Sequence, residues 1–233
     1  QRGIQVGPKG LELSGLIDHS VFECPGDHSC KGLSLSGAGP EDSRPFSRPI
    51  ALGTNKAVYV EDNVFNYAFP NDGAQDAYAG ARYVFRFNTV NGTNIEHHGA
   101  DSGGFRGVHS FEIYGNNFTL ARGHWRMFYF RSGTGALFDN VWTGPFDGNE
   151  FNVYRARPEN FPPWGACNGS SAWDGNRGSR LNPGWPCLDQ TGYVFTQNPG
   201  GSYTSVPMYL WNNFTNGGPM PGPQAAETST APY

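Results

Sequence analysis

The stretch that decides the fold runs from Tyr83 to Thr143 and reads YVFRFNTVNGTNIEHHGADSGGFRGVHSFEIYGNNFTLARGHWRMFYFRSGTGALFDNVWT. Short runs of aromatic and β-branched residues recur in it, and each run closes on asparagine followed by an apolar residue. The clearest cases are residues 87–90 (FNTV), 115–118 (GNNF) and 138–141 (FDNV). Runs of this kind, separated by turns rich in Asn and Gly, are typical of many short β-strands joined by tight turns.

The asparagine that precedes the apolar residue recurs at a regular interval. Taking Asn63, Asn88, Asn117, Asn140 and Asn213 as markers, the intervals are 25, 29, 23 and 73 residues, and 73 is close to three times 24. A period in the low twenties with several strands per unit predicts a parallel β-helix. Asparagine suits one corner of each unit because it tolerates the left-handed conformation and its amide can bond to neighbouring turns. The alternative is a β-sandwich with about eight to twelve residues per strand, which does not require the marker to repeat with its neighbours.

The composition also indicates an all-β chain. Glycine accounts for 33 of 233 residues, about twice the usual share, and aromatic residues make up 15%. Leu, Lys and Glu are scarce, so long helices are not expected. The net charge of −4 and the lack of a basic stripe argue against nucleic acid as a partner. No apolar run is long enough to cross a membrane.

The four cysteines form two local pairs, Cys24 with Cys30 and Cys167 with Cys187. Four cysteines allow three connectivities, and proximity favours these two; four reduced thiols are the alternative. Disulfides imply an oxidising compartment. Because the chain begins at Gln1 with neither Met nor a signal peptide, we expect a mature, secreted product.

Two parts of the chain are expected. Residues 1–214 form the parallel β-helix domain, and residues 215–233 form a tail or linker rich in Pro and Gly, suited to joining a further domain. A long loop at residues 157–192 interrupts the first part and is stapled by the second cysteine pair. A loop this long inside a compact domain is usually functional.

Four segments resemble a known family: YVEDNVF (59–65), YVFRFNTV (83–90), FEIYGNNF (111–118) and ALFDNVW (136–142). They are similar to repeats of right-handed parallel β-helix proteins of the pectate-lyase-like superfamily, over roughly residues 10–214. The resemblance implies a right-handed solenoid and activity on, or binding of, polysaccharides. Many relatives are lyases or glycosidases, and others are non-catalytic carbohydrate-binding modules, phage tail parts or surface proteins.

The catalytic patterns of that family are not evident. Paired Asp residues on adjacent strands, as in its glycosidases, are not found, because Asp139 and Asp147 do not match. No cofactor is expected. Ca²⁺ is the alternative, although Glu61–Asp62, Asp72 and Asp76 lack a recognisable ligand spacing.

The densest cluster of reactive residues lies in the Gly-rich segment 96–109. The candidate catalytic residues there are His97, His98, Asp101, Arg106 and His109. An arginine can neutralise a uronate carboxylate while a base removes the adjacent proton, which is the logic of β-elimination. On a strand, Glu96 and His98 would point one way and His97 the other. The alternatives are a bend in which His and Asp satisfy backbone groups, and a metal site formed by the three histidines and Asp101.

Aromatic and basic residues supply candidate substrate-binding positions, because sugars stack their apolar faces on aromatic rings while polar groups fix their orientation. For each aromatic residue, ordinary packing is the alternative. The candidates are Trp125, Arg126, Arg131, Tyr154 and Arg155 on neighbouring coils, and Trp164, Trp173 and Trp185 in the long loop.

The sequence therefore predicts a secreted parallel β-helix protein that recognises, and as an enzyme would cleave, a plant cell-wall or uronic-acid polysaccharide. As an enzyme it would be a lyase or a glycoside hydrolase. One alternative is a non-catalytic binding module, for example of the xylan type, from a larger enzyme. Another is a structural or filament-forming surface protein that self-associates through strand edges at the ends of the stack.

Overall fold

The computed structural model describes residues 2–7, 13–26, 30–37, 50–69, 73–98, 107–122, 126–146, 151–153, 207–220 and 224–225. These residues form β-strands and connecting turns, with no helix among them. The strands belong to three sheets, here called A, B and C.

In order along the stack, sheet A contains β1 (Arg2–Val6), β4 (Lys31–Ser36), β7 (Gln75–Tyr78), β10 (Ile95–His97), β13 (Phe128–Phe130), β16 (Phe151–Val153) and β20 (Gln224–Ala225). Sheet B contains β2 (Gly15–Asp18), β5 (Val58–Glu61), β8 (Arg82–Arg86), β11 (Ser110–Tyr114), β14 (Thr134–Phe138) and β17 (Tyr209–Trp211). Sheet C contains β3 (Val21–Cys24), β6 (Val64–Tyr67), β9 (Thr89–Asn91), β12 (Asn117–Thr119), β15 (Val141–Thr143), β18 (Phe214–Thr215) and β19 (Gly218–Pro219).

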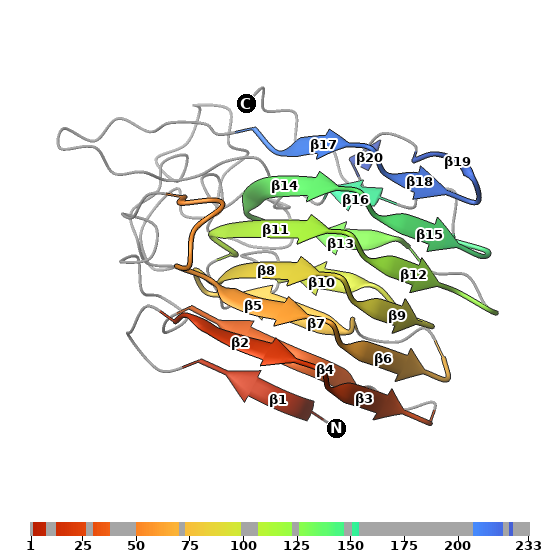
Figure 1. Ribbon diagram of the computed structural model, residues 1–233, viewed down its shortest axis with the longest axis horizontal. Coiled ribbons are helices and arrows are strands. Elements are labelled where there is room, and N and C mark those ends of the chain that lie inside the picture. The colour runs from red at the N-terminus through yellow and green to blue at the C-terminus, as the bar shows by residue number, and fades with distance from the viewer. Residues whose placement is uncertain are drawn as a thin grey trace, which may run out of the picture.

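The chain visits the three sheets in the same order, A then B then C, from β1 to β18. Each strand therefore pairs in parallel with the strand three places before it, as β5 does with β2 and β8 with β5. In Figure 1, sheets B and C face the viewer and sheet A lies behind them. The antiparallel pairing of β19 with β18 is the exception among the described strands. The prediction of an all-β chain with parallel strands is confirmed.

A ladder of buried asparagines runs along the corner between sheets B and C. We call one set of consecutive strands from sheets A, B and C a round. The ladder contains one asparagine from each of five successive rounds: Asn63, Asn88, Asn116, Asn140 and Asn213. Each side-chain amide donates to the oxygen of the next amide, over 2.9–3.1 Å. Each also donates to a sheet B carbonyl of the previous round, as Asn116 does to Phe85 over 2.9 Å.

The ladder also satisfies the backbone at the corner. The backbone N–H of each asparagine up to Asn140 donates to the amide oxygen of the next one, and Ser20 does the same to Asn63 in the first round. The residue before each ladder position has a left-handed φ, for example 55° at Asp62 and 56° at Phe87. The corner is thus a repeated pair, a left-handed residue followed by an asparagine.

Two expectations about the markers were wrong. The marker in the segment FEIYGNNF (111–118) is Asn116 and not Asn117, because Asn116 occupies the buried corner while Asn117 is the exposed first residue of β12. The interval of 73 residues does not hold three rounds. The amide of Asn140 donates directly to Asn213, and β17 pairs directly with β14, so a single enlarged round joins them.

The core lies between the three sheets, where alternate side chains point inward. On sheet C the inward row is Phe22, Phe65, Val90, Phe118 and Trp142, which are register partners in successive strands. Phe118 and Trp142 stack at 5.0 Å between ring centroids and 3° between planes, and both are buried. Stacking of like residues along the row thus builds an apolar core one strand at a time.

The first predicted disulfide is confirmed. Cys24, at the end of β3, is bonded to Cys30, just before β4, with 6.0 Å between Cα atoms. Cys167, Cys187 and the long loop lie outside the described residues. Sheet pairing also continues past residue 214, because β19 adds to sheet C and β20 to sheet A within the segment that we expected to be tail or linker.

The ladder makes a sharp prediction about two adjacent residues. Asn116→Ala should lower the free energy of unfolding by about 3 kcal/mol or more, because it leaves several buried hydrogen-bonding groups without partners. Asn117→Ala should change it by no more than about 0.5 kcal/mol, since that side chain is exposed. Urea denaturation of the two variants measures both values, and an equal loss in the two would contradict the assignment.

Candidate functional site

Outward-pointing polar side chains of sheet A come together on neighbouring strands. Ser34, Asp76, Glu96 and Tyr129 are register partners on β4, β7, β10 and β13. Adjacent strands lie about 4.8 Å apart, so these side chains form one row across the sheet. The hydrogen bond between Asp76 and His98 places that histidine on the same face, whereas His97 points into the core. The predicted alternation of this segment is confirmed.

Asp76 is the centre of the row. One carboxylate oxygen accepts a hydrogen bond from the Lys31 ammonium, and the other lies 2.5 Å from Nδ1 of His98. The Asp76 side chain is only 4% exposed, whereas those of Lys31 and His98 are 21% and 23% exposed. Burial alone would raise the pKa of Asp76, but the hydrogen bonds and charges of His98 and Lys31 outweigh it and lower that pKa.

Glu96 lies beside Asp76 but is shifted in the opposite direction. Burial raises its pKa, the charge of Asp76 adds to this, and Arg131, His98 and Lys31 only partly oppose it. Two carboxyl groups on adjacent strands therefore differ in their readiness to hold a proton. Such a pair, in which the surroundings move two carboxyl pKa values in opposite directions, is the usual basis of acid–base chemistry.

Tyr129 brings two arginines to the same place. The guanidinium of Arg126 lies 4.1 Å from the Tyr129 ring centroid, and that of Arg131 lies 4.2 Å from it. Both distances are short enough for cation–π attraction. We call the following seven residues the sheet A cluster: Lys31, Asp76, Glu96, His98, Arg126, Tyr129 and Arg131.

His97 has a different environment from its neighbour. Its side chain is buried and stacks on Phe130, with 4.0 Å between ring centroids. Nδ1 lies 3.1 Å from the carbonyl oxygen of Ser132, which can only accept, so Nδ1 carries the proton. Nε2 is therefore the acceptor for the Tyr83 hydroxyl, 2.5 Å away. Burial lowers the pKa of His97 to about 3, and these contacts give the residue a structural role in the core.

The other predicted site residues fall into three groups. His109 is buried just before β11 of sheet B, with Nδ1 3.3 Å from the Ser110 hydroxyl. Arg126 and Arg131 belong to the sheet A cluster. The remaining predicted residues lie outside the described part of the chain: Asp101, Arg106, Trp125, Tyr154, Arg155, Trp164, Trp173 and Trp185.

Two members of the cluster were missed in the sequence. Lys31 carries no local signal, because it follows the cysteine loop and reaches Asp76 across 45 residues. Asp76 was considered only as a Ca²⁺ ligand. Aligning QDAY (75–78) with IEHH (95–98) as successive sheet A strands would have placed it beside Glu96.

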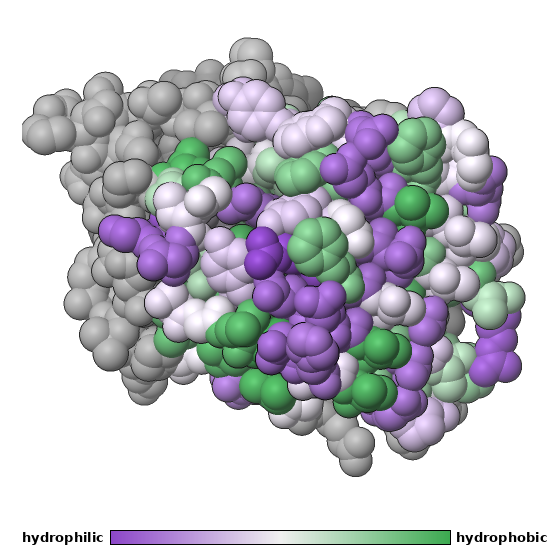
Figure 2. Space-filling model, in the orientation of Figure 1, coloured by the Kyte–Doolittle hydropathy of each residue, from purple (hydrophilic) through white to green (hydrophobic). Residues whose placement is uncertain are grey.

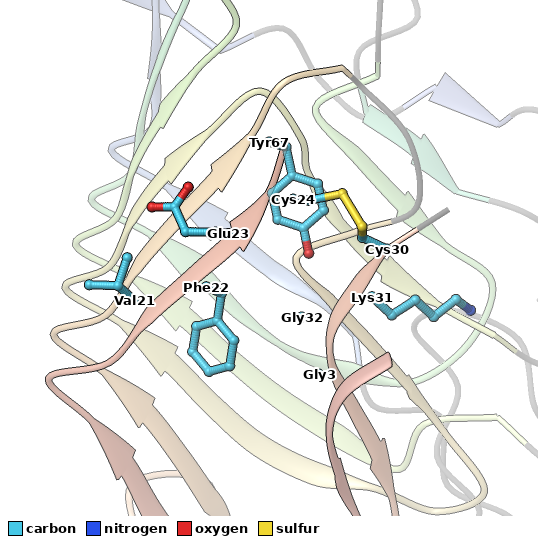
Figure 3. Close-up of a pocket in the computed structure, with 9 residues that line it drawn as sticks. All are labelled: Gly3, Val21, Phe22, Glu23, Cys24, Cys30, Lys31, Gly32 and Tyr67. Carbon is cyan, nitrogen blue, oxygen red and sulfur yellow. A yellow bond between two sulfur atoms is a disulfide. The ribbon is translucent and has the colours of Figure 1, made fainter. Parts of the chain in front are cut away.

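A cavity of about 210 Å³ lies at the first end of the stack, between β3 and β4. Figure 3 shows the rings of Phe22 and Tyr67 together with the Cys24–Cys30 bond around it, while Glu23 and Lys31 point away from Phe22. Glu23 and Lys31 also line it, so its walls are of mixed polarity. Lys31 is the residue that this cavity shares with the sheet A cluster.

Neither a metal site nor a membrane span emerges from the described segments. They hold no group of three or more His, Cys, Asp or Glu side chains arranged to bind a metal ion. They also contain no helix that is long and apolar enough to cross a membrane.

The comparisons with known proteins gave no match. No family model, curated protein or solved structure matches the chain.

The pKa of His97 predicts how stability depends on pH. The unfolded chain, with a histidine pKa near 6.5, binds a proton that the folded chain binds only near pH 3. Stability should therefore fall as the pH is lowered from 6.5, by up to about 1.4 kcal/mol per pH unit. His97→Gln should lose this component. Thermal or urea unfolding between pH 4.5 and 6.5 measures the difference between the two proteins.

The comparison with the variant is needed because Glu96 also affects stability in part of this pH range. Its raised pKa means that its contribution to stability increases as the pH is lowered, opposite to that of His97. Glu96 is common to both proteins, so its contribution cancels in the difference. Asp76, with its lowered pKa, acts below that range. Parallel stability curves for wild type and His97→Gln would contradict the assignment.

Proposed function

We propose that this chain is a secreted, right-handed parallel β-helix protein that binds a uronic-acid polysaccharide at the sheet A cluster and cleaves it by β-elimination. The repeated A–B–C order of strands and the corner ladder support a solenoid. Right-handed crossovers are the rule between parallel strands. The Cys24–Cys30 bond supports an oxidising, extracellular setting.

The charge of the cluster supports an acidic ligand. Lys31, Arg126 and Arg131 carry permanent positive charge. On the acidic side, Asp76 is ionised, while burial favours the protonated form of Glu96. Arginine binds carboxylates with paired N–H donors, so the two guanidinium groups beside Tyr129 are suited to holding a uronate carboxylate.

The single observation that carries the proposed reaction is the contact between His98 and Asp76. The carboxylate accepts the Nδ1 proton over 2.5 Å, which leaves the Nε2 lone pair to take another proton. A buried carboxylate in this position orients the imidazole and stabilises the imidazolium that forms. His98 keeps 23% of its side chain exposed, so a ligand can reach it.

In the proposed reaction, Nε2 of His98 removes the proton on the carbon next to the uronate carboxylate. Arg126 and Arg131 stabilise the negative charge that develops on that carboxylate. The bond from the neighbouring ring carbon to the glycosidic oxygen then breaks, a carbon–carbon double bond forms, and the leaving oxygen takes a proton from Glu96. The products are one unsaturated and one ordinary chain end.

Replacing His98 tests the reaction. His98→Asn keeps a donor toward Asp76 but lacks the base, so the release of unsaturated ends should fall by about a hundredfold or more while polysaccharide binding persists. Absorbance at about 235 nm, the usual signal of such ends, and affinity electrophoresis on polygalacturonate and alginate provide the two measurements. His19→Asn is a matched control, because His19 pairs with Asp18 over 3.1 Å at an exposed site outside the cluster.

The outcomes separate the competing functions. Unsaturated ends from both variants at the wild-type rate would rule out His98 as the base. Binding of an acidic polysaccharide with no product from wild type would leave the non-catalytic module. Neither binding nor product from any acidic polysaccharide would overturn the proposed function.

A further inference from the structure

A second set of side chains gathers on the outer face of sheet B. Arg86, Tyr114, Phe138 and Trp211 are register partners on β8, β11, β14 and β17. Tyr114 and Phe138 stack at 4.6 Å and 9°, and Phe138 and Trp211 stack at 4.3 Å and 5°. Arg86 fixes the start of the row, because it donates to the Tyr114 hydroxyl over 2.7 Å and pairs with Glu61. The rings are therefore held in place before any ligand arrives.

The row ends at Trp211, whose indole ring is covered on one face by Phe138. β17 is the end strand of sheet B, so Phe138 packs on one face of the Trp211 indole and no described strand lies on the other side. Trp211 is 49% exposed. Tyr209, two residues earlier and on the same side of β17, is 51% exposed. Figure 2 views this side of the molecule, where apolar and weakly polar residues lie among strongly polar ones.

We propose that Tyr209 and Trp211 form a binding surface for the rings of a neutral polysaccharide. A pyranose ring presents a flat face of C–H groups, and such a face can stack on the indole as the next member of the row. Beside Trp211, the exposed side chains of Asn212 and Asp139, joined by a hydrogen bond of 2.5 Å, offer partners for sugar hydroxyls.

Charge selects a neutral ligand over an acidic one. In the described part of the chain, no lysine or arginine forms an ion pair with Asp139. The charge of Arg86 is already balanced by Glu61. The surface is therefore neutral to negative and would repel a uronate, unlike the sheet A cluster. The inference does not depend on the function proposed for that cluster, because the two sites lie on different sheets.

Substitution of Trp211 tests the surface. Trp211→Ala should weaken binding of soluble xylan and glucomannan about tenfold or more, and Trp211→Phe, which keeps a ring, should give an intermediate value. Tyr209→Ala should also weaken it. Affinity electrophoresis with the full chain measures retention, and size-exclusion chromatography of the same samples reports the oligomeric state. Retention by polygalacturonate should not change in any of these variants.

Leu16→Ala is the matched control. Leu16 is 55% exposed and occupies the same row as Tyr209 at the opposite end of sheet B, so its removal should leave retention unchanged. Two results would overturn the inference: no retention of wild type by either neutral polysaccharide, and equal retention of wild type and Trp211→Ala. Equal retention together with a shift from oligomer to monomer in Trp211→Ala would assign the surface to self-association instead.

Discussion

The buried asparagine ladder is the interaction on which the rest of the structure depends. A side-chain amide is both donor and acceptor, so each asparagine can satisfy the backbone of the round before it while its own backbone is satisfied by the round after it. Such a pattern has no natural end and repeats with every round. It also imposes a left-handed residue just before each asparagine, which costs roughly 1–2 kcal/mol where that residue is not glycine, as at Phe87. Several buried hydrogen bonds at each corner offset this cost.

The ladder fixes the register of the strands but allows the number of residues in each round to vary. Successive ladder residues are 25, 28, 24 and 73 positions apart, yet each makes the same bonds to its neighbour. Variation in length is therefore accommodated elsewhere in the round, and the strands beside the corner stay aligned. Because of that alignment, Asp76 from one round, Glu96 from the next and Tyr129 from a third form one row on sheet A. The proposed site is a consequence of register held at a corner on which none of its own residues lies.

The sequence predicted what depends on short-range chemistry. The corner could be recognised because asparagine must follow a left-handed turn, and the opposite directions of His97 and His98 follow from strand alternation. The choice between Asn116 and Asn117 could not be made locally, since both lie in the same turn and only the stacking of rounds buries one of them. The pairing of Lys31 with Asp76 was hidden for a similar reason, because the two residues are 45 positions apart, with β5 and β6 between their strands.

His97 and His98 differ in their surroundings, because His97 is buried in the core and His98 is partly exposed on the outer face of sheet A. His97 is enclosed by Phe130, Tyr83 and the Ser132 carbonyl, and a neutral imidazole meets every demand of that position. The charged groups on the outer face of sheet A are not needed to satisfy the hydrogen bonds of the core. A buried ion pair seldom stabilises a fold more than apolar side chains of similar volume would, because removing the charges from water costs as much as their attraction returns. The cluster around Asp76 is therefore poorly explained by stability. The proposed function accounts for it as a set of charges held ready for a ligand.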